Sequence, residues 1–215
     1  MFDFWFSIGK VIWIDALLSG DNALVIAMAC RNLPARQRTL GMIFGALAAV
    51  LMRVACTGIV SQLLEIPYLK LIGAIALVYV AVKMCLPDSE GEELVKSSDK
   101  LFRAILIVMT ADIVMSVDNM IAVAAVANGN FVILAIGLLV SIPMIVAGAA
   151  IITAILNRYG ILIWAGAALL GWIAGELFVS DIALTPYHAK ELFVSVAGGI
   201  GSLIVVTLAV WKKES

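Results

Sequence analysis

Two short polar segments interrupt long apolar stretches of the sequence and share one pattern of side chains. DALLSGDN occupies 15–22 and DIVMSVDN occupies 112–119. The matched pairs are Asp15 with Asp112, Ser19 with Ser116, Asp21 with Asp118, and Asn22 with Asn119. Carboxylate and amide oxygens without His or Cys suit hard cations such as Mg²⁺, Ca²⁺ or Mn²⁺, and they suit Cu⁺ and Zn²⁺ poorly. The doubled pattern therefore favours a site for a divalent cation.

Both segments lie in stretches long enough to cross a bilayer, where inserting a carboxylate has a large free-energy cost. An aspartate at the centre of a membrane helix costs about 2.5–3.5 kcal/mol to insert, so four of them cost about 10–14 kcal/mol. These side chains must therefore face one another, water or a cation. The polar residues could instead hold helices together through hydrogen bonds, and Ser19 and Ser116 suit either role.

The first segment also predicts a local distortion of its own helix. Asp15, Ser19 and Asn22 share one face of a regular helix, whereas Asp21 points about 120° away from Asp15. We expect the helix to break at Ser19-Gly20, which turns Asp21 inward and frees backbone carbonyls as further ligands. The second copy has Val117 where Gly20 stands, so a break there is a weaker expectation.

The composition of the chain is that of an integral membrane protein. Its 215 residues are 64% hydrophobic and 13% charged, with a mean hydropathy of +1.13, whereas soluble domains are about 45–50% apolar and about 25% charged. The net charge is −1 and no basic face exists, so we expect no nucleic-acid partner. The predicted fold class is an all-α membrane protein whose surroundings are the lipid bilayer.

The apolar stretches predict seven transmembrane helices, because each has about the 20 residues that a span requires. They lie near 11–30, 39–61, 67–86, 104–127, 131–156, 160–180 and 192–211. Residues 1–86 would form a first three-helix repeat and 104–180 a second one. A cytoplasmic linker at 87–103 separates the repeats, and 181–215 supply a loop and the seventh helix.

The positions of Lys and Arg predict the orientation of the chain. Of 14 such residues, ten border one side of the expected spans, three border the other, and Arg53 lies within a span. The N-terminus should be outside and the C-terminus cytoplasmic. The second motif begins 97 residues and three spans after the first, so the two copies enter the membrane from opposite faces. Such inverted repeats are common in secondary transporters.

This topology predicts where the acidic residues lie. Asp21 and Asp118 should meet near the midplane, while Asp15 and Asp112 flank the site above and below. Arg53 is expected to neutralise one motif aspartate, and Glu176 to be an interfacial carboxylate or a cation attractant at the outer mouth. The glycines of AGGIG at 197–201 indicate close helix packing, with a hinge as the alternative.

The doubled Asp-x-x-x-Ser-x-Asp-Asn pattern resembles the TerC family of bacterial membrane proteins, in its short YjbE-type branch. The family belongs with the LysE-like transporters and is associated with manganese(II) export. The resemblance implies that the metal ligands are Asp15, Asp21, Asn22, Asp112, Asp118 and Asn119. It also implies a multi-pass protein of the bacterial inner membrane.

The expected function is therefore secondary transport and not catalysis. We expect the protein to export a divalent cation by alternating access, with Mn²⁺ as the leading candidate. Protons are the expected counter-ion, and a homo-oligomer is left open. Two alternatives stand beside it, a metal-dependent membrane helper for exported proteins and an intramembrane aspartyl protease, which also needs two buried carboxylates.

Overall fold

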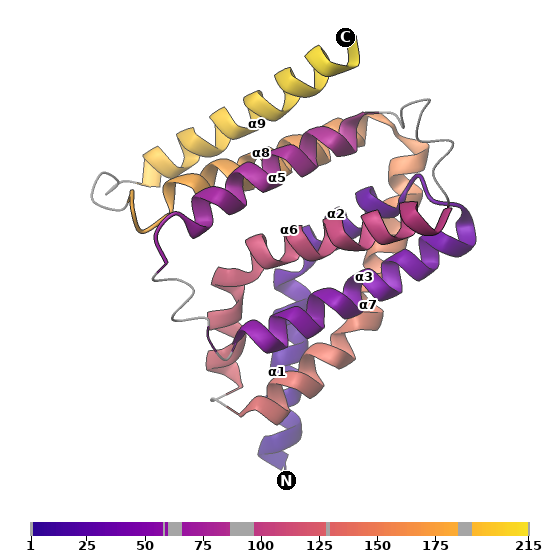
Figure 1. Cartoon of the computed structure of the whole chain (residues 1–215). Coiled ribbons are helices and arrows are strands. Elements are labelled where there is room, and N and C mark those ends of the chain that lie inside the picture. The colour runs from indigo at the N-terminus through magenta and orange to yellow at the C-terminus, as the bar shows by residue number, and fades with distance from the viewer. Residues whose placement is uncertain are drawn as a thin grey trace. The chain divides into compact units, whose positions relative to one another are not determined.

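The computed structural model describes residues 2–57, 59, 66–86, 97–127, 130–184 and 191–214. All the regular elements in these ranges are helices (Figure 1). They are α1 (Phe2–Leu18), α2 (Gly20–Cys30), α3 (Ala35–Thr57), α5 (Leu69–Cys85), α6 (Ser97–Val126), α7 (Phe131–Arg158), α8 (Ile161–Val179) and α9 (Glu191–Glu214). The predicted all-α fold is confirmed over the described part of the chain.

Four of these helices are long and apolar enough to cross a membrane by themselves: Ala35–Thr57, Phe131–Arg158, Ile161–Val179 and Phe193–Lys213. Two bent pairs qualify if each is one span, namely Phe4–Leu18 with Gly20–Cys30 and Asp99–Ser116 with Asn119–Val126. The described residues thus hold four to six candidate spans. The third expected span corresponds to α5, whose 17 residues lie at the short end of the range for a membrane helix.

The helices divide into two compact units, and each unit combines segments that are distant in sequence. The first unit takes residues 1–61 and 97–154, and the second takes 62–96 and 155–215. In the first unit, α1, α3, α6 and α7 share an apolar core that includes Val11, Val50, Val123 and Leu138. Small residues allow close approach: a Cβ at Gly45 of α3 would lie 3.4 Å from Val108 of α6, as expected where helices associate in lipid.

In the second unit, α8 packs against both α5 and α9 (Figure 1). A Cβ placed on Gly171 of α8 would lie 2.6 Å from the carbonyl oxygen of Gly201 in α9. The hydroxyl of Ser202 donates to the carbonyl oxygen of Ala168 at 2.7 Å. Gly198 and Gly201, two of the three glycines at 197–201, therefore serve close helix packing, which confirms the first of the two expectations for them.

Asp181, two residues after the end of α8, caps the first turn of α5. The residue is 1% exposed, and its carboxylate accepts hydrogen bonds from the backbone N–H groups of Tyr68 at 2.9 Å and Leu71 at 3.2 Å. Tyr68 itself adopts a left-handed φ of 66°. Burial raises the pKa of Asp181, and the backbone N–H donors, including those of Ala183 and Lys70, lower it by more, so the net pKa lies below the ordinary value.

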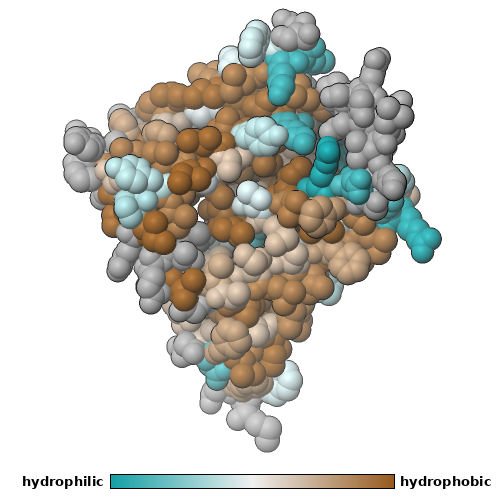
Figure 2. Space-filling model, in the orientation of Figure 1, coloured by the Kyte–Doolittle hydropathy of each residue, from teal (hydrophilic) through white to brown (hydrophobic). Residues whose placement is uncertain are grey.

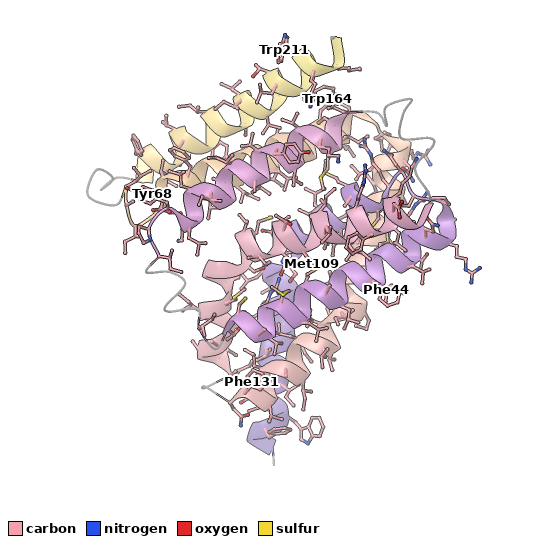
Figure 3. All side chains as sticks on the ribbon, viewed as in Figure 1. Phe44, Tyr68, Met109, Phe131, Trp164 and Trp211 are labelled. Atoms are coloured by element: carbon pink, nitrogen blue, oxygen red, sulfur yellow. The ribbon has the colours of Figure 1, made fainter. Side chains whose placement is uncertain are left out.

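Large apolar side chains on the surface agree with a lipid environment. The face drawn in Figure 2 is occupied mainly by hydrophobic residues. Trp211 is 69% exposed and projects from α9 (Figure 3), and Phe131 is 58% exposed at the start of α7. In water such side chains would form extensive apolar patches, which soluble monomers rarely expose.

Candidate functional site at the two helix breaks

Both motif copies lie where a helix changes direction. α1 ends at Leu18 and α2 begins at Gly20, with a bend of 57° across Ser19. In the second copy, the part of α6 that ends at Ser116 and the part that begins at Asn119 are bent by 72°. The break predicted at Ser19-Gly20 is confirmed. The second copy bends as well, although Val117 stands where the first copy has glycine.

Three charged side chains meet inside the first unit. Asp15 of α1, Arg53 of α3 and Asp112 of α6 are 0%, 2% and 4% exposed. The Nη1 atom of Arg53 pairs with Oδ1 of Asp15, and its Nη2 atom pairs with Oδ1 of Asp112. A single planar guanidinium thus joins three helices, a use to which the fork of donors in arginine is well suited. Arg53 was expected to neutralise one motif aspartate, and it contacts two.

Three hydroxyl groups donate further hydrogen bonds to these carboxylates. Ser116 donates to Oδ1 of Asp112 at 3.0 Å and lies 2.8 Å from Nη2 of Arg53, while Ser19 donates to Oδ1 of Asp15 at 3.3 Å. The hydroxyl of Ser141 in α7 donates to Oδ2 of Asp15. Ser141 was not anticipated from the sequence, although a serine two residues before Pro143 in a very apolar stretch is a detectable signal.

The position of Asp15 and Asp112 corrects one geometric expectation. We expected them to flank the site on opposite sides, because spans of opposite direction place them at different depths. Instead both reach the same guanidinium. The depth argument assumed straight spans, whereas these helices bend within a turn of the aspartates. The charge of Arg53, once buried, also favours having more than one carboxylate acceptor.

Asp21, Asn22 and Asn119 lie at the breaks themselves. The side-chain amide of Asn119 lies 3.5 Å from the carbonyl oxygen of Leu18, its acceptor at the end of α1. Asn22 is 5% exposed, and neither its Oδ1 nor its Nδ2 atom has a hydrogen-bond partner. Asp21 is half-buried and accepts the backbone N–H of Asn22 at 2.8 Å. Residues from both motif copies therefore meet at the end of α1.

The expected meeting of Asp21 with Asp118 falls outside the described residues, because the side chain of Asp118 is not among them. Within the described part of the chain, no three His, Cys, Asp or Glu side chains are arranged to hold a metal ion. The six-residue ligand set therefore stays a prediction.

Several polar atoms of the site are nevertheless free to accept or donate a further bond. Oδ2 of Asp112 and Nε of Arg53 are buried without a hydrogen-bond partner, as is the amide of Asn22. Each such atom costs about 1–3 kcal/mol of desolvation that no bond offsets. Asp21 also interacts electrostatically with Arg53 and Asp112. Together Asp15, Asp21, Asp112 and Arg53 carry a formal charge of −2, and the oxygens among the free atoms suit a hard cation.

A bundle of apolar helices with carboxylates, amides and a guanidinium at two helix bends defines a polytopic membrane protein with a polar interior site. The chain belongs to the integral membrane protein TerC family, whose profile matches residues 2–215. The resemblance noted from the motifs is thereby confirmed.

Three similar proteins come from Bacillus subtilis (strain 168). The uncharacterized membrane protein YjbE is 40% identical over 189 residues, covering 88% of this chain and 86% of YjbE. The uncharacterized membrane protein YceF is 26% identical and covers 94% and 81% of the two chains, while the uncharacterized membrane protein YkoY is 24% identical and covers 83% and 62%. No solved structure shows significant similarity to this chain.

Proposed function

We propose that this protein is a secondary transporter that exports a divalent metal cation through the site at the two helix bends, with Mn²⁺ as the leading candidate. The observation that carries the proposal is the contact between Asn119 and the carbonyl oxygen of Leu18. It joins the polar groups of one motif copy to the broken backbone of the other. Discontinuous helices whose breaks supply carbonyl and side-chain oxygens are a recurrent way of binding ions in transporters.

The proposed architecture has seven spans, with a 3+3 inverted repeat followed by one C-terminal helix. The repeat pairs α1/α2, α3 and α5 with α6, α7 and α8. The division into units supports this pairing, because the first unit takes the first two spans of each half and the second takes the third of each half plus α9. The proposed location is the bacterial inner membrane, with the N-terminus outside and the C-terminus cytoplasmic.

The proposed ligands divide into two groups. Asp21, Asn22, Asp118 and Asn119 lie at the bends. Among the described side chains of this group, Asp21 is half-buried and Oδ1 of Asn22 has no hydrogen-bond partner, so their oxygens can bind a cation. Asp15 and Asp112 lie one to two turns away and share Arg53. A divalent ion would balance the formal charge of −2 on the four described charged groups. Protons are the proposed counter-ion, because buried carboxylates that lose the metal are neutralised by taking up protons.

An intramembrane aspartyl protease is less well supported by these contacts. Its two carboxylates must lie close enough to share a proton. Asp15 and Asp112 instead each face Arg53, and their nearest hydroxyls are serines that donate to them. A metal-dependent helper for exported proteins would bind the same ion without carrying it across the membrane, so flux separates it from a transporter.

The test is Mn²⁺ flux into liposomes that contain only the purified protein and a trapped Mn²⁺-quenched dye. We expect flux from wild type and a reduction of more than about tenfold in Asp21→Asn, since ligand-shell changes commonly cost 10–100-fold. Asp99→Asn, an identical chemical change at an exposed residue in the first turn of α6, is the matched control. Mn²⁺ binding without flux by wild type would favour the helper, and equal flux in Asp21→Asn would refute the site.

A further inference from the structure

Arg53 breaks the symmetry of an otherwise doubled site. The repeat alignment places Ala149 of α7 at the equivalent position, and Ala149 is fully buried. One guanidinium therefore serves both Asp15 and Asp112, which are themselves equivalent in the two copies. Bridging two carboxylates from opposite halves is what a metal ion at the centre of the repeat would also do.

We propose that Arg53 is a tethered competitor of the transported ion, holding Asp15 and Asp112 in the ion-free protein and making the site selective for divalent over monovalent cations. This inference rests on the proposed function, and it adds a residue that sets which ions the site accepts. The guanidinium is always charged, so its competition comes from position and does not depend on loss of a proton.

The contacts of Arg53 explain why an entering ion must compete with it. Its two terminal nitrogens use Oδ1 of Asp15 and Oδ1 of Asp112, and Ser141 donates to the second oxygen of Asp15. Oδ2 of Asp112 is buried and unpartnered, so it is available to an ion before the guanidinium moves. A cation that binds there and draws on the remaining oxygens displaces Arg53 from at least one carboxylate.

The charge of the ion then determines which cations can displace Arg53 from the carboxylates. A monovalent cation brings the same charge as the guanidinium but must be captured from solution, whereas Arg53 is held beside the carboxylates at a high effective concentration. A divalent cation gains about twice the Coulomb energy at each carboxylate. Arg53 should therefore exclude Na⁺ and K⁺ at cellular concentrations, whereas Mn²⁺, Mg²⁺ or Ca²⁺ should displace it.

The competing explanation is that Arg53 only holds α1, α3 and α6 together. The two roles predict opposite effects on ion binding. A static support, once removed, loosens the site and weakens the affinity for the ion. A competitor, once removed, frees two carboxylates and strengthens it.

The experiment is titration calorimetry of Mn²⁺ into purified wild type and Arg53→Gln, at low salt and with NaCl added. We expect Arg53→Gln to bind Mn²⁺ about tenfold more tightly at low salt, because the fraction of protein with a free site rises. Added Na⁺ should weaken Mn²⁺ binding in Arg53→Gln and leave wild-type affinity unchanged. Arg53→Lys keeps the charge without the two-pronged geometry, and it should bind about threefold more tightly than wild type.

Arg53→Lys carries the test if Arg53→Gln does not fold. A second measurement uses Arg53→Ala, in which guanidinium chloride far below denaturing concentrations should compete with Mn²⁺, whereas wild type should show no such competition. If wild type binds Mn²⁺ and the folded Arg53 variants bind it no more tightly, the competitor role is wrong and the proposed function stands. If wild type and the variants all fail to bind Mn²⁺, Mg²⁺ and Ca²⁺, both are wrong.

Discussion

The side-chain amide of Asn119 in α6 lies 3.5 Å from the backbone carbonyl oxygen of Leu18, the last residue of α1. Two residues that are 101 positions apart thus meet where one helix has broken and the other bends. A carbonyl group at a helix end has no N–H donor within its own helix, so it can accept a hydrogen bond from another group. The contact therefore ties the two polar motifs into one site.

Asn22→Leu should separate stability from ion binding. The substitution removes a buried amide whose two polar atoms have no partner and replaces it with an apolar side chain of similar size. We expect the metal-free protein to become more stable by about 1–3 kcal/mol, measured by denaturant titration in micelles. Mn²⁺ affinity, measured by calorimetry, should fall by more than about tenfold, since changes around a bound metal commonly cost 10–100-fold in affinity. Asn157→Leu, at an exposed position of α7, should change neither quantity, and a destabilised Asn22→Leu would contradict the prediction.

Ser141→Ala should weaken the support of Asp15. Its hydroxyl donates to Oδ2 of that carboxylate, and both residues are fully buried. Loss of a hydrogen bond to a charged group costs about 1.5–3 kcal/mol, so the free energy of unfolding should fall by this amount. Thr207→Ala is the control, because the hydroxyl of Thr207 is exposed and bonds only to carbonyls of its own helix. Equal losses in the two variants would mean that the contact with Asp15 has no special weight.

Asp181→Asn should alter how stability depends on pH. The folded-state pKa of Asp181 lies below its ordinary value, so the stabilisation is complete above the unfolded pKa of about 3.9 and is lost as pH falls through the folded pKa. At neutral pH we expect the variant to be less stable by about 1–3 kcal/mol, because asparagine has one acceptor oxygen where both oxygens of Asp181 accept backbone N–H groups, and a buried donor then loses its partner.

The measurement compares unfolding of wild type and Asp181→Asn at pH 7 and at successively lower pH. The difference between them should persist down to the unfolded pKa and shrink below it. A difference that stays constant as the carboxyl group protonates would show that its charge does not stabilise the first turn of α5.

Gly201→Ala and Gly199→Ala form a matched pair in α9. A Cβ on Gly201 would overlap the carbonyl oxygen of Gly171, whereas a Cβ on Gly199 would lie 3.9 Å from Trp172, an ordinary contact. Gly201→Ala should destabilise the protein by about 1–3 kcal/mol through overpacking. Gly199→Ala should stabilise it by about 0.5–1 kcal/mol, because alanine is the better residue in a helix interior. Thermal unfolding of both variants checks the pair, and similar shifts in Tm would contradict the packing of α8 on α9.

Part of this structure could be predicted because it depends on local sequence. The apolar stretches predict helices, since each backbone polar group in lipid must be paired within its own segment. The break at Ser19-Gly20 follows from glycine beside a polar residue in an apolar helix, and it is confirmed. The bend near Val117 was the weaker expectation, because a β-branched residue offers no local reason for it, yet the second copy bends by 72°.

The amino-acid sequence by itself determined the membrane environment, the helical elements and the doubled set of acidic and amide residues. It also identified Arg53 as a charge that needs a carboxylate partner. Only the tertiary structure decided that Asp15 and Asp112 share that guanidinium, that Ser141 supports Asp15 and that Asn119 reaches Leu18. The physical reason is that helix periodicity determines which residues share a face, whereas partners on other helices depend on where the helices bend and how small residues let them approach.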